Sequence, residues 1–245
     1  MLCSIARVGR QLRAAKLLVG PDVRLVVRPE YVASSYPTGE PLGLWAERAA
    51  WAPQGPEYTA MGLIAQQNKV YLSGNVYETD VHFPGLYFQT RFVLDDSGTL
   101  VLRYRRLVSM FAPTPNDVWD RCLDIFGLDA VFPVARTELG NLACIASAEI
   151  LYPEIARVLA LKGAEVLLHS TSEVGSPRLT PKEVAKRARA YANCCWVDSA
   201  HSAGILNSDS PASRATACAR SLTTKARCGL RQASVNRWSL TPKLT

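Results

Sequence analysis

The stretch CIASAEILYPEIARVLALKGAEVLLHSTSE, residues 144–173, decides the fold predicted for this chain. It begins with a short apolar run that stops at small residues around Ser147. A helix is expected from Pro153, because proline favours the first helical turn, and the glycine of LKGAE marks the end of that helix. The apolar segment EVLLHS then has the character of a buried strand. Strand, helix and strand in this order predict an α/β layered sheet.

The same plan extends to both sides of this stretch. Residues 180–204 again predict a helix followed by a strand, with Thr180 as the helix cap and Pro181 in the first turn. Apolar spacing and β-branched runs predict the remaining elements: a basic first helix within 1–20, strands at 23–27 and 70–80, helices at 40–53 and 56–69, a hairpin at 86–107 around DDSG, and two strands at 130–146. The Pro- and Asp-rich segment 112–127 is expected to be an irregular loop.

The net charge of +7 is concentrated at the end of the chain. Residues 206–245 hold seven of the 28 Lys and Arg and one of the 21 Asp and Glu, so the preceding part is nearly neutral. We therefore expect no nucleic-acid partner for the domain itself. No apolar stretch is long enough for a membrane span, so no membrane partner is expected.

The cysteines and histidines give no metal motif. The seven cysteines include no CxxC pair, and the three histidines are not grouped with them. Without an export signal, reduced cysteines and a cytoplasmic location are expected. Residues 1–20 contain Arg but no acidic residue, so they also resemble an organelle transit peptide, although an amphipathic helix explains them as well.

Three predicted strand ends carry residues that could act together on a carbonyl carbon. They are Glu30 in VVRPEY, the pair Arg105–Arg106 in LRYRRL, and Ser147 in IASAEILYPE. A carboxylate can take a proton, a cation can stabilise an oxyanion, and a hydroxyl can attack carbon. This set of residue types is what acyl transfer from an amide or nitrile requires.

These motifs resemble the nitrilase or carbon–nitrogen hydrolase superfamily over about residues 22–205. The family shows Glu in FPE, Lys in YRK, Cys in CxD/E followed by FPE, and a later RA-x-EN helix, in this chain order. The corresponding text here is VVRPEY, VLRYRRL, CIASAEILYPE and RARAYANCCWV. The resemblance implies an α-β-β-α sandwich. It also implies cleavage of small-molecule nitriles, amides or N-carbamoyl compounds, without a cofactor, and association into homodimers.

The resemblance assigns roles residue by residue. Glu30 falls on the general base, Arg106 on the catalytic Lys and Ser147 on the nucleophilic Cys, so two of the three are substituted. Around them Tyr31, Ala148, Glu173 and His201 are expected to bind the substrate. Cys144 lies three residues before the nucleophile position and is expected to be a core thiol. The activity could be weak, or the chain could be a non-catalytic member that binds a ligand or another subunit.

Each of these residues also has a simpler interpretation. Glu30 could be a solvated loop acid, Arg106 could pair on the surface with Asp95 or Asp96, and Ser147 could be a small packing residue.

Residues 1–205 are expected to form one carbon–nitrogen hydrolase-like domain, with an atypical N-terminal edge where the opening strand of the family is missing or scrambled. After residue 205 the resemblance stops, where relatives continue with further strands. The tail at 206–245 is rich in Ser, Thr and Arg and has no sustained period, so it is expected to be poorly ordered. A shift of reading frame near residue 206 or a divergent tail would each produce this composition.

Overall fold

The secondary structure comes from a computed structural model that describes residues 2–34, 36–37, 39–172, 179–202, 220–222 and 239–241. Its helical segments are, in chain order, α1 (Leu2–Val19), α2 (Leu42–Ala49), α3 (Pro56–Asn68), η1 (Pro115–Val118), α4 (Trp119–Val131), η2 (Ser147–Leu151), α5 (Pro153–Leu161) and α6 (Pro181–Asn193). Its strands are β1 (Leu25–Val27), β2 (Ala50–Trp51), β3 (Tyr71–Thr79), β4 (Tyr87–Leu94), β5 (Leu100–Arg105), β6 (Ala135–Thr137), β7 (Gly140–Ala146), β8 (Val166–Thr171), β9 (Trp196–His201), β10 (Arg220–Leu222) and β11 (Ser239–Thr241).

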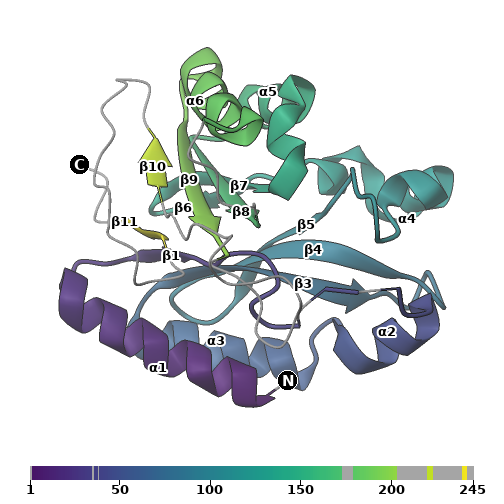
Figure 1. Ribbon diagram of the computed structural model, residues 1–245, viewed down its shortest axis with the longest axis horizontal. Coiled ribbons are helices and arrows are strands. Elements are labelled where there is room, and N and C mark those ends of the chain that lie inside the picture. Colours follow the sequence, from purple (N-terminus) through teal and green to yellow (C-terminus); the bar gives the residue numbers. More distant parts are fainter. Residues whose placement is uncertain are drawn as a thin grey trace.

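The strands form two sheets that face each other between two helical layers (Figure 1). The first sheet has the order β11-β1-β3-β4-β5, with β2 beside β3, and the second has the order β10-β9-β8-β7-β6. Strands β7, β8 and β9 are parallel, and α5 and α6 make the crossovers that parallel neighbours require. Helices α1 and α3 cover the first sheet, and α5 and α6 cover the second. The predicted α-β-β-α sandwich is therefore confirmed.

Apolar side chains fill the spaces between the layers. The inner core between the sheets includes Leu25, Val27, Val93, Leu102, Leu142, Cys144, Ala146, Val166 and Leu168. Cys144 is completely buried in β7, and burial raises the pKa of its thiol, as expected for a core cysteine. Strands β1, β5 and β7 therefore pack in one shared core, which fixes where their carboxyl ends lie.

The prediction of an irregular loop at 112–127 is wrong, because this segment forms η1 and α4. The cause is a capping box: the backbone N–H of Thr114 donates to Asp117 Oδ2 at 2.7 Å, and Pro115 occupies the first turn. Trp119 and Leu123 of α4 then pack on the inner core. The sequence TPND carried this signal, but its density of Pro and Asp suggested a loop.

Both ends of the chain add to this fold. The predicted basic helix is α1, which buries Ile5, Val8 and Leu12. Within the tail, β10 pairs antiparallel with β9, and β11 pairs antiparallel with β1. Both strands therefore lie at sheet edges, where the sequence had predicted that strands of the family are absent. The other tail residues lie outside the described residues. None of the helices in the described part of the chain is long and apolar enough to cross a membrane.

Candidate active site

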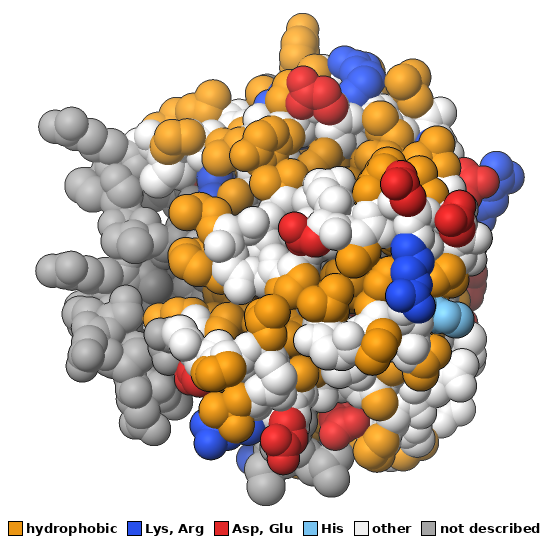
Figure 2. All heavy atoms as spheres, turned by 90° about the vertical axis from the view of Figure 1, so that its right-hand side faces the viewer, with side chains coloured by type: hydrophobic (Ala, Val, Ile, Leu, Met, Phe, Trp, Pro, Cys, Tyr) orange, Lys and Arg blue, Asp and Glu red, His pale blue; other side chains and the backbone are white. Residues whose placement is uncertain are grey.

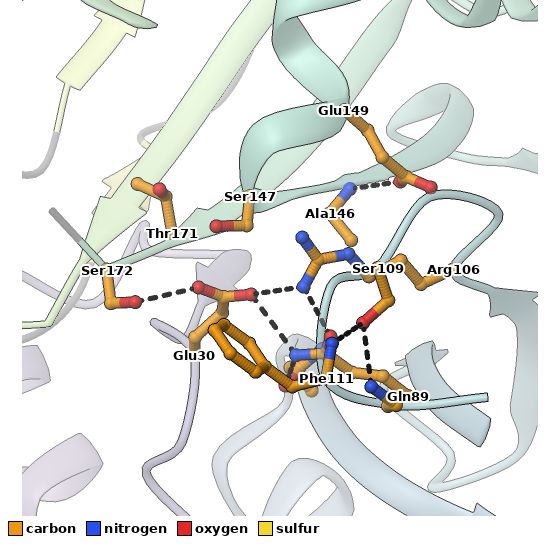
Figure 3. A network of polar contacts seen from close by, with 12 residues as sticks. Glu30, Gln89, Arg106, Ser109, Phe111, Ala146, Ser147, Glu149, Thr171 and Ser172 are labelled. Carbon is orange, nitrogen blue, oxygen red and sulfur yellow. Dashed lines mark hydrogen bonds and ion pairs between the residues drawn. The ribbon is translucent and has the colours of Figure 1, made fainter. Parts of the chain in front are cut away.

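Three strand ends meet at one place and bring Glu30, Arg106 and Ser147 together (Figure 3). Glu30 follows β1, Arg106 follows β5, and Ser147 follows β7. β1 and β5 belong to the first sheet and β7 belongs to the second, so the site lies where the ends of the two sheets adjoin. Figure 3 shows the three side chains directed toward a common space, with Thr171 and Ser172 at its border.

Glu30 is a buried acid with three polar neighbours. Only 1% of Glu30 is exposed to solvent, so the interpretation of this residue as a solvated loop acid is wrong. Ser172 Oγ donates to one carboxylate oxygen at 3.0 Å, and Gln89 Nε2 donates to the other at 3.1 Å. Arg106 Nη1 lies 3.5 Å from that second oxygen. The carboxylate is therefore fixed in position and compensated in charge.

Arg106 is buried beside this acid and does not pair on the surface. Its Nη1 donates to Gln89 Oε1 at 2.5 Å, and its Nε donates to the carbonyl of Val108 at 2.6 Å. Asp95 instead accepts hydrogen bonds within the β4–β5 turn. The interpretation of Arg106 as a surface partner of Asp95 or Asp96 is therefore wrong. A guanidinium in this position can hold an oxyanion but does not release its proton.

Ser147 occupies a strained corner. Its φ of 46° lies in the left-handed region, which costs a non-glycine residue about 1–3 kcal/mol and persists only where the surrounding structure holds it. The residue is 6% exposed, and its Oγ accepts a hydrogen bond from Lys182 Nζ at 3.3 Å. A hydroxyl held at a strained strand-to-helix turn is typical of a nucleophile, although a buried small side chain also fits this corner.

His169 supports the corner from β8 as a neutral imidazole. Its Nε2 lies 2.9 Å from the carbonyl oxygen of Ser147, and its Nδ1 lies 2.9 Å from Ser199 Oγ. Because a carbonyl only accepts, Nε2 carries the proton and Nδ1 accepts from the serine hydroxyl. Burial, followed by the positive charge of Lys186, lowers the pKa of His169 well below its usual value.

This histidine predicts a loss of stability in acid. A His with a depressed pKa in the folded state contributes stability that is fully present above about pH 6.5 and is lost as the pH falls, because the unfolded chain binds the extra proton. We expect His169 to add up to about 1.4 kcal/mol per pH unit to the fall in unfolding free energy below that pH. Urea unfolding between pH 7.5 and pH 5 measures the slope. The slope should decrease in His169→Gln and stay unchanged in His82→Gln, whose imidazole is exposed; equal slopes in all three proteins would contradict the assignment.

Glu149 connects the corner of Ser147 to the corner of Arg106. One carboxylate oxygen accepts from the backbone N–H groups of Leu107 and Val108 at 2.6 and 3.1 Å. The other accepts from the backbone N–H of Ala146 at 2.9 Å and from Tyr104 Oη at 2.8 Å. The residue has no exposed surface. Sequence reasoning quoted Glu149 within the CxD/E motif but gave it no role.

The predicted substrate-binding residues are only partly placed around the site. Tyr31 follows Glu30 with a φ of 62°, and burial, followed by the Glu30 carboxylate, raises the pKa of its phenol to about 12. Ala148 is half-buried in η2, and His201 is buried at the end of β9. Glu173 lies outside the described residues. Among the described residues, no group of three or more His, Cys, Asp or Glu could hold a metal ion.

An open groove runs along the segment that follows Arg106. Its volume is about 680 Å³, and its lining consists of Leu42, Leu86, residues 107–114, Asn116 and Asp117. Met110 and Phe111 are 88% and 75% exposed there. Figure 2 shows this side of the molecule, where hydrophobic side chains are spread over much of the surface. The segment that carries Arg106 therefore offers apolar surface next to the buried polar site.

Sequence reasoning missed Lys182, which lies in the first turn of α6. Its ammonium group reaches across to the end of β7 and contacts Ser147. The two residues are 35 positions apart, so no local spacing could have indicated the contact.

Comparison with known proteins identifies the class that this fold and site define. The family model for carbon-nitrogen hydrolases matches residues 1–229. The chain belongs to the carbon-nitrogen hydrolase family, as its motifs predicted. The match continues past residue 205, where the motif resemblance ends.

Individual relatives are distant and longer. A protein of Pseudomonas protegens described as a hydrolase is 31% identical over 184 residues, which make up 75% of this chain and 60% of that protein. A formamidase of Allorhizobium ampelinum is 27% identical over 151 residues, which make up 61% of this chain and 40% of the formamidase. The chain therefore spans less than two thirds of each of these relatives.

The crystal structure of an amidase from a Nesterenkonia species has a similar fold. It superimposes with a TM-score of 0.71, covering 99% of this chain and 85% of the amidase, at 14% sequence identity. At 14% identity the comparison establishes that the two proteins share the sandwich fold. The chemistry of this chain has to be inferred from the residues of its own site.

Proposed function

We propose that the chain hydrolyses carbon–nitrogen bonds of small amides, nitriles or N-carbamoyl compounds through an ester formed on Ser147. The observation that carries this proposal is the buried ion pair of Glu30 and Arg106, 3.5 Å apart, at the strand ends where Ser147 also lies. Burying a charge pair is costly unless it is well compensated, so such a pair at a site of family motifs favours a catalytic purpose.

Each residue of the site has a role that suits its geometry. Ser147 Oγ attacks the carbon of an amide or N-carbamoyl group, the proton of Oγ passes to the nitrogen, and the carbon–nitrogen bond breaks as the amine leaves. With a nitrile, attack gives an imidate on Ser147, to which water must add before ammonia leaves and the ester forms. Arg106 stabilises the oxyanion that forms, since its guanidinium is already oriented by Gln89 and Val108. Glu30 then activates the water that hydrolyses the ester on Ser147.

Short amides are the substrates we favour. The matched relatives include a formamidase, and the fold is shared with an amidase. Compounds as small and polar as formamide and acetamide suit a site whose polar members lie close together. The homodimer, the independence from cofactors and the cytoplasmic location stay predictions that the resemblance and the composition supply.

A non-catalytic function is the alternative, because Arg and Ser stand where the family motif has Lys and Cys. Such a protein would bind an amide or another subunit without turnover. Release of ammonia from a set of short amides, nitriles and N-carbamoyl compounds tests both proposals. We expect slow turnover that falls by at least about 10³-fold in Ser147→Ala and stays unchanged in Ser97→Ala, a turn variant. Binding of these compounds without any ammonia release would favour the non-catalytic function.

A further inference from the structure

The side chain of Gln89 lies between the two charged residues of the candidate site. Its Nε2 donates to Glu30 Oε1 at 3.1 Å, and its Oε1 accepts from Arg106 Nη1 at 2.5 Å. The same nitrogen of Arg106 lies 3.5 Å from the same oxygen of Glu30. Gln89 is 2% exposed, so these contacts are shielded from water. One amide group therefore engages both the carboxylate oxygen and the guanidinium nitrogen that face each other (Figure 3).

The fold fixes where this amide lies and which way it points. Gln89 belongs to β4, and its backbone carbonyl accepts from the N–H of Arg106 at 2.9 Å. Its Nε2 also donates to Asn75 Oδ1, on β3, at 3.2 Å. If the amide were turned round, its oxygen would face the Glu30 carboxylate and its NH2 group would face the guanidinium, and both contacts would be repulsive. The observed orientation is therefore the one that the surrounding charges favour.

These contacts leave one end of the Arg106 guanidinium available to a ligand. Its Nε donates to the carbonyl of Val108, and its Nη1 is held by Gln89. Within the part of the chain that the structure describes, no protein group accepts a hydrogen bond from Nη2. In Figure 3 this nitrogen carries no dashed line and lies on the side of Ser147. The nitrogen that the protein does not use is therefore the one that faces the proposed nucleophile.

An arginine and a carboxylate this close frequently form a bidentate pair, in which two guanidinium N–H groups donate to the two carboxylate oxygens. Since Nε is held by Val108, such a pair with Glu30 would use Nη1 and Nη2 and would turn Nη2 away from Ser147. We propose that Gln89 is a positioning residue that keeps the Glu30–Arg106 pair from becoming bidentate, so that Nη2 stays available to the oxyanion. This inference rests on the proposed function and names the residue that keeps its cation oriented.

A lysine at position 106 would not need this residue. Its donors all sit on one ammonium nitrogen, so it cannot form a fork with Glu30 and can donate to the carboxylate and to an oxyanion at the same time. The effect of Gln89 on the reaction should therefore depend on the arginine at position 106. A residue that only supports the fold would matter equally with either cation.

Hydrolysis of para-nitrophenyl acetate, corrected for the rate of Ser147→Ala, tests this dependence. The para-nitrophenolate leaves without taking up a proton, so kcat/KM reports the attack by Ser147 and the stabilisation of the oxyanion. Gln89→Met keeps the size of the side chain but has no amide, and we expect it to lower kcat/KM by about 10²-fold, the usual effect of losing one oxyanion donor. The matched control Gln67→Met, at an exposed position of α3, should stay within about twofold of the parent.

The same substitution is then made in an Arg106→Lys background. There we expect Gln89→Met to change kcat/KM by less than about threefold, because a lysine forms no fork. An equal loss in both backgrounds would overturn the proposal and leave Gln89 as a structural residue. A Gln89→Met protein as fast as the parent would overturn it as well. A folded parent no faster than Ser147→Ala would instead overturn the proposed function.

Gln89→Asn decides the question if Gln89→Met does not fold. It keeps an amide in the core, but its side chain is one methylene shorter and cannot reach Glu30 and Arg106 together. We expect kcat/KM to fall at least about tenfold with the arginine and less than about threefold in the Arg106→Lys background. A loss of the same size in both backgrounds, or no loss in either, would contradict the positioning role.

Discussion

Changing Ser147 to Cys and Arg106 to Lys together is expected to raise amide hydrolysis by about 10²–10³-fold over the parent. A thiol, with a pKa near 8.5, forms the attacking anion far more readily than a serine hydroxyl. A lysine at position 106 can pass a proton to the leaving amine, which the guanidinium cannot do. The rate of ammonia release from the best short amide measures the gain.

The matched control is Ser97→Cys with Arg136→Lys, which makes the same two chemical changes at exposed positions. It should leave the rate unchanged. A folded Ser147→Cys, Arg106→Lys protein as slow as the parent would count against the assignment of these positions to the nucleophile and the cation.

Glu149→Ala is expected to be the most destabilising single change near the site, at about 3–5 kcal/mol. It removes the acceptor of three backbone N–H groups and of the Tyr104 hydroxyl; Leu107, Ala146 and Tyr104 are buried and Val108 is half-buried. The buried donors among them would then lie without a partner. For a chain of this size, the loss corresponds to a fall in Tm of about 6–20 °C, measured by circular dichroism.

Glu154→Ala is the control, because this carboxylate is exposed in the first turn of α5. It should cost less than about 1 kcal/mol, the usual contribution of an acid at a helix N-terminus. If Glu149→Ala unfolded at the parent temperature, the carboxylate would not be what holds the Ser147 and Arg106 corners together.

Much of the fold could be predicted from sequence because its signals are local. The crossovers through α5 and α6 follow from Pro153, Gly163 and Thr180, which mark helix starts and ends within a few residues. The hairpin of β4 and β5 follows in the same way from DDSG. The helix α4 was missed although its capping box is also local, because Thr114 and Asp117 were read as loop residues.

Only those residues of the candidate site could be predicted that belong to a family motif and directly follow a predicted strand. Glu30, Arg106 and Ser147 could be proposed together because each follows a predicted strand, and strand ends of a layered sheet adjoin. Lys182 could not be proposed, since its contact with Ser147 depends on how far α6 extends over the second sheet. A long flexible side chain adds to this uncertainty, because its sequence position does not fix where its amine lies.

The central claim is that these strand ends form one site in which Ser147 carries the acyl group of a cleaved substrate. Acid quenching of the protein during turnover of a short activated ester, followed by peptide mapping with fragmentation, tests this claim most directly. We expect the mass of one acyl group on Ser147, more of it in Glu30→Gln because removal of the ester is slowed, and none in Ser147→Ala. An acyl group on Cys144 instead, or no adduct on a protein that turns over substrate, would contradict the claim.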